Sequence, residues 1–580
     1  MAEAAAAAVA WLTEGEVILT SFEAFAIAAS VELVAATAYN NYAKRRAREK
    51  MREAHNASLR DRYVMARSGI AQRRIVLGRQ RVSGSISFIK SYGANKEKLV
   101  VVLPLSAEEI DGVEEIYFDD EQVVLDGSGN VLGVKRRELF TISSASATFT
   151  LQGAPKAGTV SAVAKYGTNE IPLTVSGVSG ADVTVSGASA VASGQVTITY
   201  QPAVSPFAPS EGLSGVSAIT TDGSGNGSVT LPSTPTAGSV SVVQPGNATI
   251  DTVDLDVTAL SSVSGAVVTL TGATPSTTYT VNYQYAGPSK ARIRTFLGQP
   301  GQVADPLLIA ALPGVWTAAH VGNGIAYLVL EADYDPDAFT GGIPNLSALA
   351  RGSKIYDPRT GVAAWTENAA LLARHVAMHP LGGRLPAARI NDESFITAAN
   401  VCDTMVDYVV NGRTYTRKRY TAGLVLSSGQ RADDVVQDLC EAMGGDRAFT
   451  DGQLRVKAGA WVTPIQVLDE SWLIREVGSV QVQRRRPSEE ICNILSGVFA
   501  DEEDDYQLRD FPTLRSATYI AEDKEDLPDD IELNAVTFSA QAQQIAAQRM
   551  RRKRFGRRIS VNCNLRAYGV EWGDVLYVNL

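Results

Sequence analysis

Two histidines have the spacing that could most directly hold a metal ion. His375 and His379 lie four residues apart, which places two imidazoles on one face of a helix. Such a pair binds zinc when a glutamate or another third ligand lies close by. The neighbouring sequence offers no such ligand. We therefore interpret the pair as surface or helix-capping histidines and expect no metal site.

Residues typical of other chemistry are sparse. The four cysteines stand alone in their segments and form no C-x-x-C pair, which favours reduced, mostly buried thiols: Cys402, Cys440, Cys492 and Cys563. No Gly-Lys-Ser/Thr follows a glycine run, and no G-x-S-x-G elbow is present. The sequence therefore predicts no catalytic residue, no cofactor and no enzymatic activity.

Charged and turn-forming segments have two interpretations each. Acidic runs at 501–505 and 522–526 are typical of solvated loops, the alternative being a carboxylate pair for glycan hydrolysis. The basic cluster at 549–558 fits a helix end with solvated or interface arginines better than a DNA contact, because no aromatic residues are interleaved for base stacking. The sequence Asp-Gly-Ser-Gly-Asn occurs at 126–130 and 222–226, and it favours hairpin turns over calcium loops.

Length and composition limit the class of protein. A chain of 580 residues is too long for a single hydrophobic core, so several domains are expected. Hydrophobic residues make up 45% and charged residues 20%, as in ordinary globular domains. The net charge of −10 excludes a general nucleic-acid binder and predicts a surface that repels passing DNA.

The N-terminal segment 2–39 is very apolar, and a basic run follows it at 44–50. Glu14, Glu16, Glu23 and Glu32 interrupt the apolar run before it reaches the length of a membrane span. No basic residues precede it, as they would in a signal peptide. We predict a helix that packs against its own copies or another protein in a channel; a membrane contact is the alternative. Its candidate lumen-facing residues are Phe22, Phe25, Ile27, Val31, Leu33 and Val34.

An internal repeat marks the middle of the chain. Residues 155–161 recur as 235–241, and 179–185 recur as 264–270, in a stretch rich in Ser, Thr, Val, Ala and Gly. Each copy ends in an alternating strand, at 196–200 and 279–283. We predict two tandem β-sandwich or small barrel modules, joined by a linker at about 204–226.

The remaining chain predicts short strands from residue 71 onward and a mixed α/β part after 287. Helices are expected at 366–378, 392–408, 431–443 and 538–553. The third is clearest, because Val435, Val436, Leu439, Cys440 and Met443 share one face and Gly444-Gly445 ends it. The expected fold class is mainly β with α+β parts.

Ordered blocks outside the repeats resemble the lambda-type tail tip protein J and related central hubs of long-tailed phages. The blocks cover about 75–125 and 290–580. They include Gly78-Arg79 to Gly84, the acidic segment around Gly112, a last block at 573–575, and a longer central block containing Gly324, Tyr327, Gly342, Pro344, Asn345, Tyr356, Asp357 and Trp365.

This resemblance implies a homotrimeric hub of β-barrel domains that closes the tail tube at the distal end of the virion. The implied partners are the distal tail protein ring, the tape-measure protein, and other tail-tip and fibre proteins. DNA would pass only in transit, and contact with a host receptor would be indirect. In relatives of this kind the strand at 131–137 would turn back directly into 291–294, so the two modules are read as an insertion at that hairpin.

The resulting division assigns 1–70 to the N-terminal segment, 71–147 and 287–365 to the first hub domain, 148–203 and 204–286 to the modules, 366–460 to an α+β domain, and 461–580 to a later hub barrel. The chain stops at Leu580 after a strand that looks internal to a barrel, whereas the resembled proteins continue into receptor-binding parts. Two alternatives remain, a binding module for a host glycan or side fibre in the inserted repeats, and a tail-borne peptidoglycan hydrolase.

Overall fold

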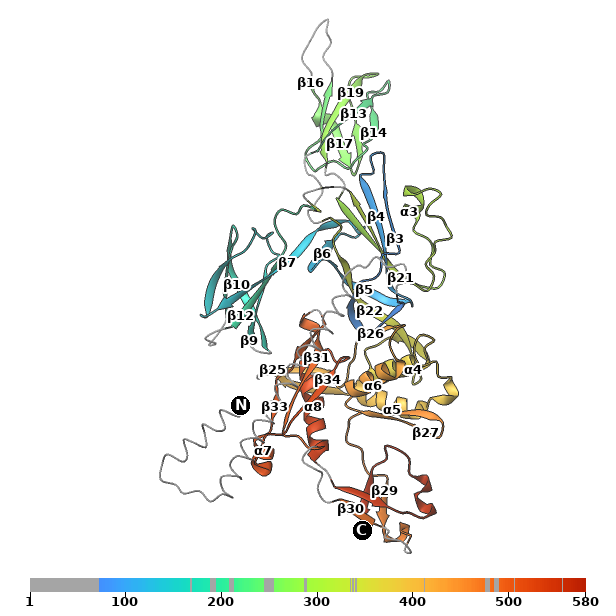
Figure 1. The fold of residues 1–580 in the computed structure, drawn as a ribbon. Helices are drawn as coiled ribbons and strands as arrows, with labels where there is room; N and C mark the ends of the chain where they lie inside the picture. Colours follow the sequence, from blue (N-terminus) through green and yellow to red (C-terminus); the bar gives the residue numbers. More distant parts are fainter. Residues whose placement is uncertain are drawn as a thin grey trace, which may run out of the picture.

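The computed structural model describes residues 72–166, 169–187, 194–207, 213–244, 255–285, 289–333, 335, 338–339, 342–410, 413–474, 480–483, 490–504, 506–554 and 557–580. The predicted apolar helix at 2–39, with its candidate lumen residues, lies outside these residues. Among the helices of the described part, none is long and apolar enough to cross a membrane. The protein is mainly β, with several sheets and few helices, as the sequence predicts (Figure 1).

The first core lies between two sheets. One contains β2 (Arg79–Val82), β5 (Ile110–Phe118), β6 (Glu121–Leu125), β7 (Val131–Ile142) and β22 (Leu346–Asp357), with β23 (Val362–Trp365) paired to β22. The other contains β3 (Phe88–Tyr92), β4 (Lys98–Ser106), β20 (Ala291–Phe296) and β21 (Ala326–Asp333). In β4, Val101 and Leu103 face the core, whereas Val100 and Val102 face α3 (Pro306–Ala311) and Trp316. Burial on both faces explains the continuous apolar run of this strand.

The first inserted module continues directly from this core. Its strands are β8 (Ser146–Thr150), β9 (Ser161–Tyr166), β10 (Asn169–Ser179), β11 (Asp182–Ser186) and β12 (Gly194–Tyr200). The long strand β7 pairs with β6 near its beginning and with β12 from Arg136 to Ile142. One strand therefore serves both the first core and the module, which has its own hydrophobic cluster.

The second inserted module is a sandwich of two sheets around a separate cluster. One sheet contains β13 (Leu213–Thr220), β15 (Ser241–Gln244), β16 (Leu255–Asp256) and β19 (Thr278–Tyr285). The other contains β14 (Gly227–Thr230), β17 (Ser261–Ser264) and β18 (Val267–Leu270), and η1 (Thr258–Leu260) precedes β17. The expected linker at 204–226 is wrong in part, because β13 pairs with β19 along eight residues. The serine-rich β13 lacked an apolar run to reveal it.

The repeated sequences form repeated turns. The backbone N–H of Lys156 donates to Gln201 at 2.7 Å, and that of Thr236 donates to Gln284 at 2.7 Å. Gly158 and Gly238 adopt matching positive φ values of 74° and 75° in these two turns. The hairpin interpretation of Asp126 is confirmed, because its Oδ1 accepts the N–H groups of Ser128 and Asn130, both at 2.8 Å. Asp222 accepts the equivalent pair in the second turn, but the hairpin prediction is wrong there, because this turn connects β13 and β14, which belong to different sheets.

The second large core is built from helices and small sheets. Its main helices are α4 (Ala369–Met378), α5 (Asp392–Asp403), α6 (Ala432–Ala442) and α8 (Ser539–Arg554), close to the predicted ranges. The helix predicted at 392–408 is wrong at its end, because Thr404 is extended and β24 begins at Met405. Short elements complete this part: η2 (Ala387–Arg389), β24 (Met405–Val410), β25 (Arg413–Lys418), β27 (Asp446–Thr450), β28 (Gln453–Lys457), β31 (Ile494–Asp501), η5 (Glu502–Asp504), β32 (Gln507–Asp510), β33 (Leu514–Arg515), α7 (Ala517–Asp523) and β34 (Pro528–Leu533).

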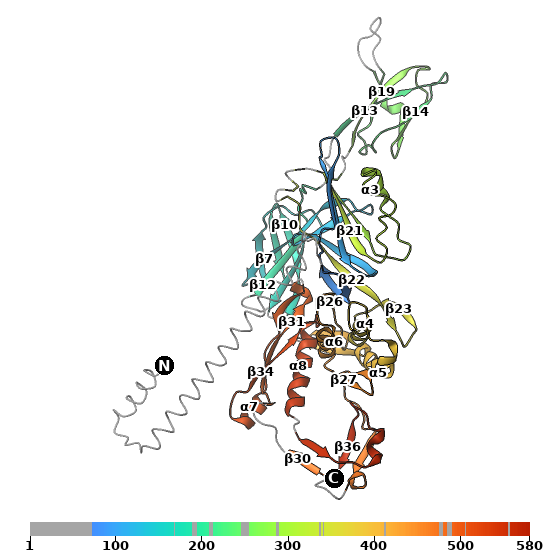
Figure 2. The ribbon, with the colours of Figure 1, turned by 45° about the vertical axis from the view of Figure 1, so that its right-hand side comes forward.

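A third part, here called the C-terminal lobe, consists of the described residues within 461–483 and 557–580. It contains β29 (Gln466–Asp469), η3 (Glu470–Trp472), β30 (Val480–Gln483), β35 (Arg558–Val561), η6 (Leu565–Gly569) and β36 (Leu576–Asn579). Figure 2 shows β30, β36 and the C-terminus at one extremity, beyond α8 and β27. The intervening residues from Cys492 to Met550 contribute to the helical core instead.

Candidate functional site

A two-stranded ribbon joins the two large cores. It pairs β1 (Arg74–Leu77) with β26 (Leu424–Ser427) in antiparallel register. Because side chains alternate along a strand, Val76 and its partner Val425 enter the first core, while Ile75 and Leu426 enter the helical core. We call this region the junction. The hydrophobic effect therefore holds both cores to the same ribbon.

Motif residues Gly78 and Trp365 lie at the junction. Gly78 has a φ of 67°, and a Cβ atom there would lie 2.3 Å from the carbonyl oxygen of Ala422. The indole Nε1 of Trp365 donates to the carbonyl oxygen of Gly78 at 3.1 Å, and the backbone N–H of Gly352 donates to it at 2.7 Å. The glycine is therefore required both by its backbone conformation and by close packing.

Motif side chains near β5 form charged contacts along the first core. Arg79 pairs with Glu114 at 2.7 Å. Gly112 lies beside Arg351, which pairs with Asp111 at 2.7 Å. Another motif glycine, Gly84, is crowded, since a Cβ there would lie 1.8 Å from the carbonyl oxygen of Pro104.

The other motif residues have structural surroundings as well. Tyr327 is buried and stacks on Phe296 at 4.6 Å, while Asn345 exchanges hydrogen bonds with Asp119. Asp357 pairs with Arg359, which also reaches Asp403 on α5. Gly324 and Gly342 occupy positive φ, Pro344 is half-buried, and Tyr356 is exposed beneath Arg374. The structure therefore spreads the motif residues over the two cores and gathers only some of them at the junction.

A polar bridge crosses the junction at Glu108, in the loop between β4 and β5. Nε2 of His379 lies 2.6 Å from one carboxylate oxygen, and Nε2 of His375 lies 3.3 Å from the other. Burial alone would raise the pKa of Glu108, but hydrogen bonds from the two histidines outweigh burial and hold this pKa well below its ordinary value. The third group that the histidine pair lacks in the local sequence is therefore supplied from 267 residues away.

The hydrogen bonds of His379 distinguish a proton bridge from a metal site. The candidate ligand atoms of Glu108, His375 and His379 lie within 4.8 Å of one another. However, Nδ1 of His379 accepts the backbone N–H of Leu381 at 3.0 Å, which leaves the ring proton on Nε2, facing Glu108. A metal-bound Nε2 would need the opposite tautomer. This geometry favours a hydrogen-bonded bridge between the two cores.

The acidic run at 522–526 and the basic cluster at 549–558 contact each other. Arg554 on α8 pairs with Glu522 at 2.8 Å and with Asp523 at the end of α7. Arg515 pairs with Asp526 at 3.0 Å, and Lys553 with Asp529. Arg554 and Lys553 thus hold α8 to α7 and β34, as expected for interface residues and unlike a free phosphate-binding face.

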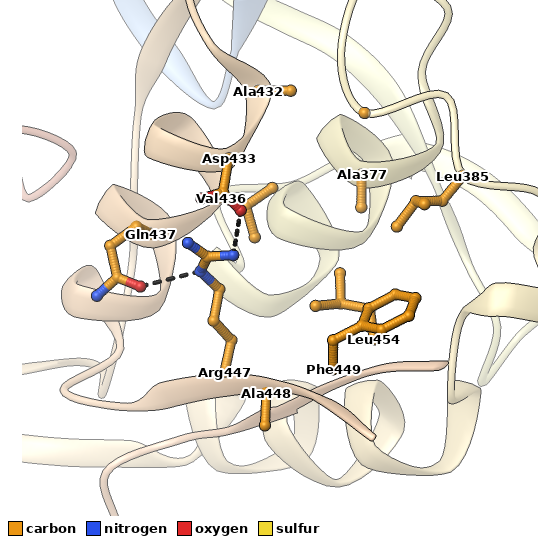
Figure 3. A pocket seen from close by; sticks show the side chains of 11 residues that line it. Ala377, Leu385, Ala432, Asp433, Val436, Gln437, Arg447, Ala448, Phe449 and Leu454 are labelled. Atoms are coloured by element: carbon orange, nitrogen blue, oxygen red, sulfur yellow. Dashed lines mark hydrogen bonds and ion pairs between the residues drawn. The ribbon is translucent and has the colours of Figure 1, made fainter. Parts of the chain in front are cut away.

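An open groove of about 600 Å³ lies against the helical core (Figure 3). Its apolar wall includes Val436, Leu454 and the half-exposed ring of Phe449. Arg447 borders it, donating to Gln437 at 2.9 Å and pairing with Asp433. This arrangement suits an apolar side chain more than a reaction, because the charged groups already neutralise one another. In the sequence, only the alternation of polar and apolar residues along β27 and β28 points to this groove.

Comparisons with known proteins point to a class. Residues 431–579 match the sequence model of a family described as "Putative phage tail protein". This span contains α6, α8 and nearly the whole C-terminal lobe. The match supports a phage tail structural protein, and hence a component of the virion. Comparison with curated protein sequences finds no match.

Solved structures add only distant likenesses. A chain from the virion of a native gene transfer agent particle is 13% identical, with 89% of this chain and 80% of that chain covered and a TM-score of 0.42. A chain of the VP16–VP17 complex of two major capsid proteins of bacteriophage P23-77 is 16% identical, with 46% and 94% covered and a TM-score of 0.10. TM-scores below 0.5 do not establish a shared fold, so the family match alone carries the class.

Proposed function

We propose that this protein forms the trimeric central hub at the distal tip of a long phage tail. The observation that carries the proposal is the match of 431–579 to phage tail proteins. In this role the hub closes the tail tube, docks on the distal tail ring, supports host attachment and lets DNA pass. It is structural and not an enzyme.

The junction supports this role on physical grounds. A hub must transmit force between a tube-facing domain and its outer braces without bending. Alternation of Val76 and Ile75 between two cores fixes their relative orientation through buried side chains. The Glu108 bridge adds a polar contact at the same junction. Both features suit a part that transmits force between two domains.

Several partners belong to the proposal. They are two further copies of the chain, the distal tail protein ring, the tape-measure protein, and tail-tip and fibre proteins. Residues 2–39 are assigned to the threefold axis or the tube lumen, against the tape-measure protein, and a membrane contact at infection is the alternative. Deleting 2–39 should leave a ring but misplace the tape measure or release DNA. Unchanged infectivity would exclude this assignment.

The alternative function, binding of a host glycan or side fibre by the inserted modules, receives less support. Exposed aromatic side chains would favour it. Tyr200, Tyr279 and Tyr283 are instead buried in the module cores. The modules do project from the first core in different directions, so they can still carry contacts to other tail proteins (Figure 1).

The position in the particle can be tested by labelling. A biotin-acceptor peptide inserted between Gly223 and Ser224 should not disturb the sandwich, because both residues are exposed in the turn that connects β13 and β14. Streptavidin–gold on purified particles should appear only at the distal tail end. Gold along the tail shaft or on the head would overturn the hub assignment, and the same peptide in the major tail tube protein provides the control.

A further inference from the structure

The groove on the helical core has room for several apolar side chains. Its volume of about 600 Å³ lies within the range of pockets that bind ligands, roughly 300–1,000 Å³. Phe449 and Leu454 come from the ribbon of β27 and β28, and Ala377 and Leu385 lie on the facing wall (Figure 3). The ring of Phe449 is 55% exposed. An apolar side chain between these walls would be removed from water, and so would this ring.

The strand β27 also has an open edge. It pairs with β28 from Asp446 to Thr450, and among the described residues no strand pairs with its other side. The backbone N–H and C=O groups along such an edge can bond to an added extended segment. Arg447, Ala448 and Phe449 all line the groove, so the strand edge and the apolar walls belong to one site. An extended segment with apolar side chains at alternate positions fits both features.

The described chain begins beside this groove. Gln72, its first described residue, packs on Gly429, where an added Cβ atom would lie 2.5 Å from Nε2 of the glutamine. The backbone N–H of Ser428 donates to the carbonyl oxygen of Arg73 at 2.9 Å. Ala432, the first residue of α6, follows Gly429 by three residues and lines the groove. The residues that precede Gln72 are therefore attached to the protein close to the groove.

We propose that residues 59–67 of the same chain dock in this groove as a strand added to β27. The segment reads Leu-Arg-Asp-Arg-Tyr-Val-Met-Ala-Arg, and in an extended strand Tyr63 and Met65 point to the same side. Met65 precedes Gln72 by seven residues, which span at most about 25 Å. A segment attached by so short a linker has an effective concentration in the millimolar range, so modest contacts are enough to dock it.

The charges around the groove complement this segment. Residues 59–67 contain three arginines and one aspartate, which gives a net charge of 3 − 1 = +2. Three exposed carboxylates lie on α6 or at the start of β27: Asp433, Asp434 and Asp446. Asp433 and Asp446 already pair with arginines of the described chain, but a carboxylate can accept further hydrogen bonds. Docking would fix the point from which residues 2–39 leave the helical core. The inference does not depend on where the protein lies in the tail.

The test measures hydrogen exchange of the full chain at residues 59–67 and at β27. Phe449→Asp places a charge in the groove, and Val362→Asp on β23 is the matched control, at a position exposed by 58% outside the groove. The wild type and the control should protect the amides of 59–67. Phe449→Asp should reduce this protection at least about tenfold, because the segment loses an apolar contact. Unchanged exchange at α8 shows that the variant is folded.

A reciprocal change in the segment tests the predicted alternation. Tyr63→Ser combined with Met65→Ser should reduce protection of β27 at least about tenfold, for the same reason. Val64→Ser should leave it unchanged, because this side chain points away from the groove in an extended strand. Equal effects of the two variants on β27 would overturn docking as a strand.

Three other results would overturn the proposal. Free exchange of 59–67 in the wild type, with or without protection at β27, shows that the segment is not the occupant. Protection of 59–67 that Phe449→Asp leaves unchanged places the segment elsewhere. Protection that disappears on a hundredfold dilution shows that a neighbouring copy supplies the segment. None of these results bears on the proposed hub, whose position is tested by labelling.

Discussion

His379 donates a hydrogen bond from Nε2 to Oε1 of Glu108 across 2.6 Å, although 270 residues of chain separate them. The histidine lies just after α4 in the helical core, and the glutamate belongs to the loop after β4 in the first core. This contact ties the two cores at the edge of the ribbon formed by β1 and β26. Its strength should depend on pH, because the pKa of Glu108 is lowered in the folded protein.

Replacing Glu108 should weaken the junction in neutral solution. Glu108→Ala leaves the half-buried Nε2 of His379 without its acceptor, so the free energy of unfolding should fall by about 1–3 kcal/mol at pH 7. A depressed carboxyl pKa contributes stability above the unfolded pKa, and this contribution decreases as pH falls below about 4. Denaturant unfolding should therefore show a smaller difference in unfolding free energy between the wild type and Glu108→Ala at pH 3 than at pH 7. An equal difference at both pH values would exclude a stabilising role for the Glu108 contact. The same loss of stability from the exposed control Glu525→Ala would exclude it as well.

Asp438 on α6 should have the opposite pH dependence. Burial, and next the charge of Glu441, raise the pKa of Asp438 to about 6. A raised carboxyl pKa reduces stability as pH rises from the unfolded value of about 4 through 6, and the loss remains above that pH. Asp438→Asn should therefore stabilise the protein by about 1–2 kcal/mol at pH 7.5 and hardly at pH 4. A variant that is destabilised at pH 7.5 would contradict the prediction.

Two glycines with similar backbone conformation should respond very differently to alanine. Gly78 has a φ of 67° and is crowded by Ala422, whereas Gly158 has a φ of 74° and no atom within 4 Å of its Cβ position. Gly158→Ala should lower the free energy of unfolding by about 1 kcal/mol, the cost of positive φ. Gly78→Ala should lower it by more than about 3 kcal/mol, because strain and a backbone clash combine. Equal effects would show that packing at the junction is looser than the structure indicates.

The second module should be removable. The carbonyl oxygen of Phe207 lies 3.4 Å from the Oγ of Ser289, so the two ends of the module are adjacent. Replacing 208–288 with two glycines should leave the rest folded, with the unfolding free energy of the helical core changed by less than about 1 kcal/mol. Hydrogen exchange at α4 and α6 measures this. Excising 143–203 instead should destabilise the first core, because β7 loses its pairing with β12. If both deletions were tolerated equally, β7 would not be a strand that the first core and the first module share.

The sequence predicted the helices well where one apolar face was distinct. Val436 and Leu439 of α6 show the spacing directly, and the helix begins and ends within one residue of the prediction. The strand β13 was missed because Ser214 and Ser217 stand among small or exposed residues. The sequence therefore shows no apolar face for this strand. Short helices such as α3 depend on a cap by Asp305 and on Leu308 packing against a sheet far along the chain.

The candidate site depended on long-range contacts that local patterns do not encode. Nothing near His375 and His379 indicates Glu108, which only the folding of β4 and β5 brings to them. The charged runs were visible in the sequence, but the pairing of Arg554 with Glu522 depends on where α7 and α8 meet. Gly78 was recognised as a motif residue, yet its requirement arises from the carbonyl oxygen of Ala422.

A three-dimensional reconstruction of the tail end would show whether this chain forms a threefold hub at the tip of the tail. We expect three copies around the tail axis, closing the tube, with the inserted modules facing outward. Density for this chain elsewhere in the particle, or around the axis with a symmetry other than threefold, would contradict it.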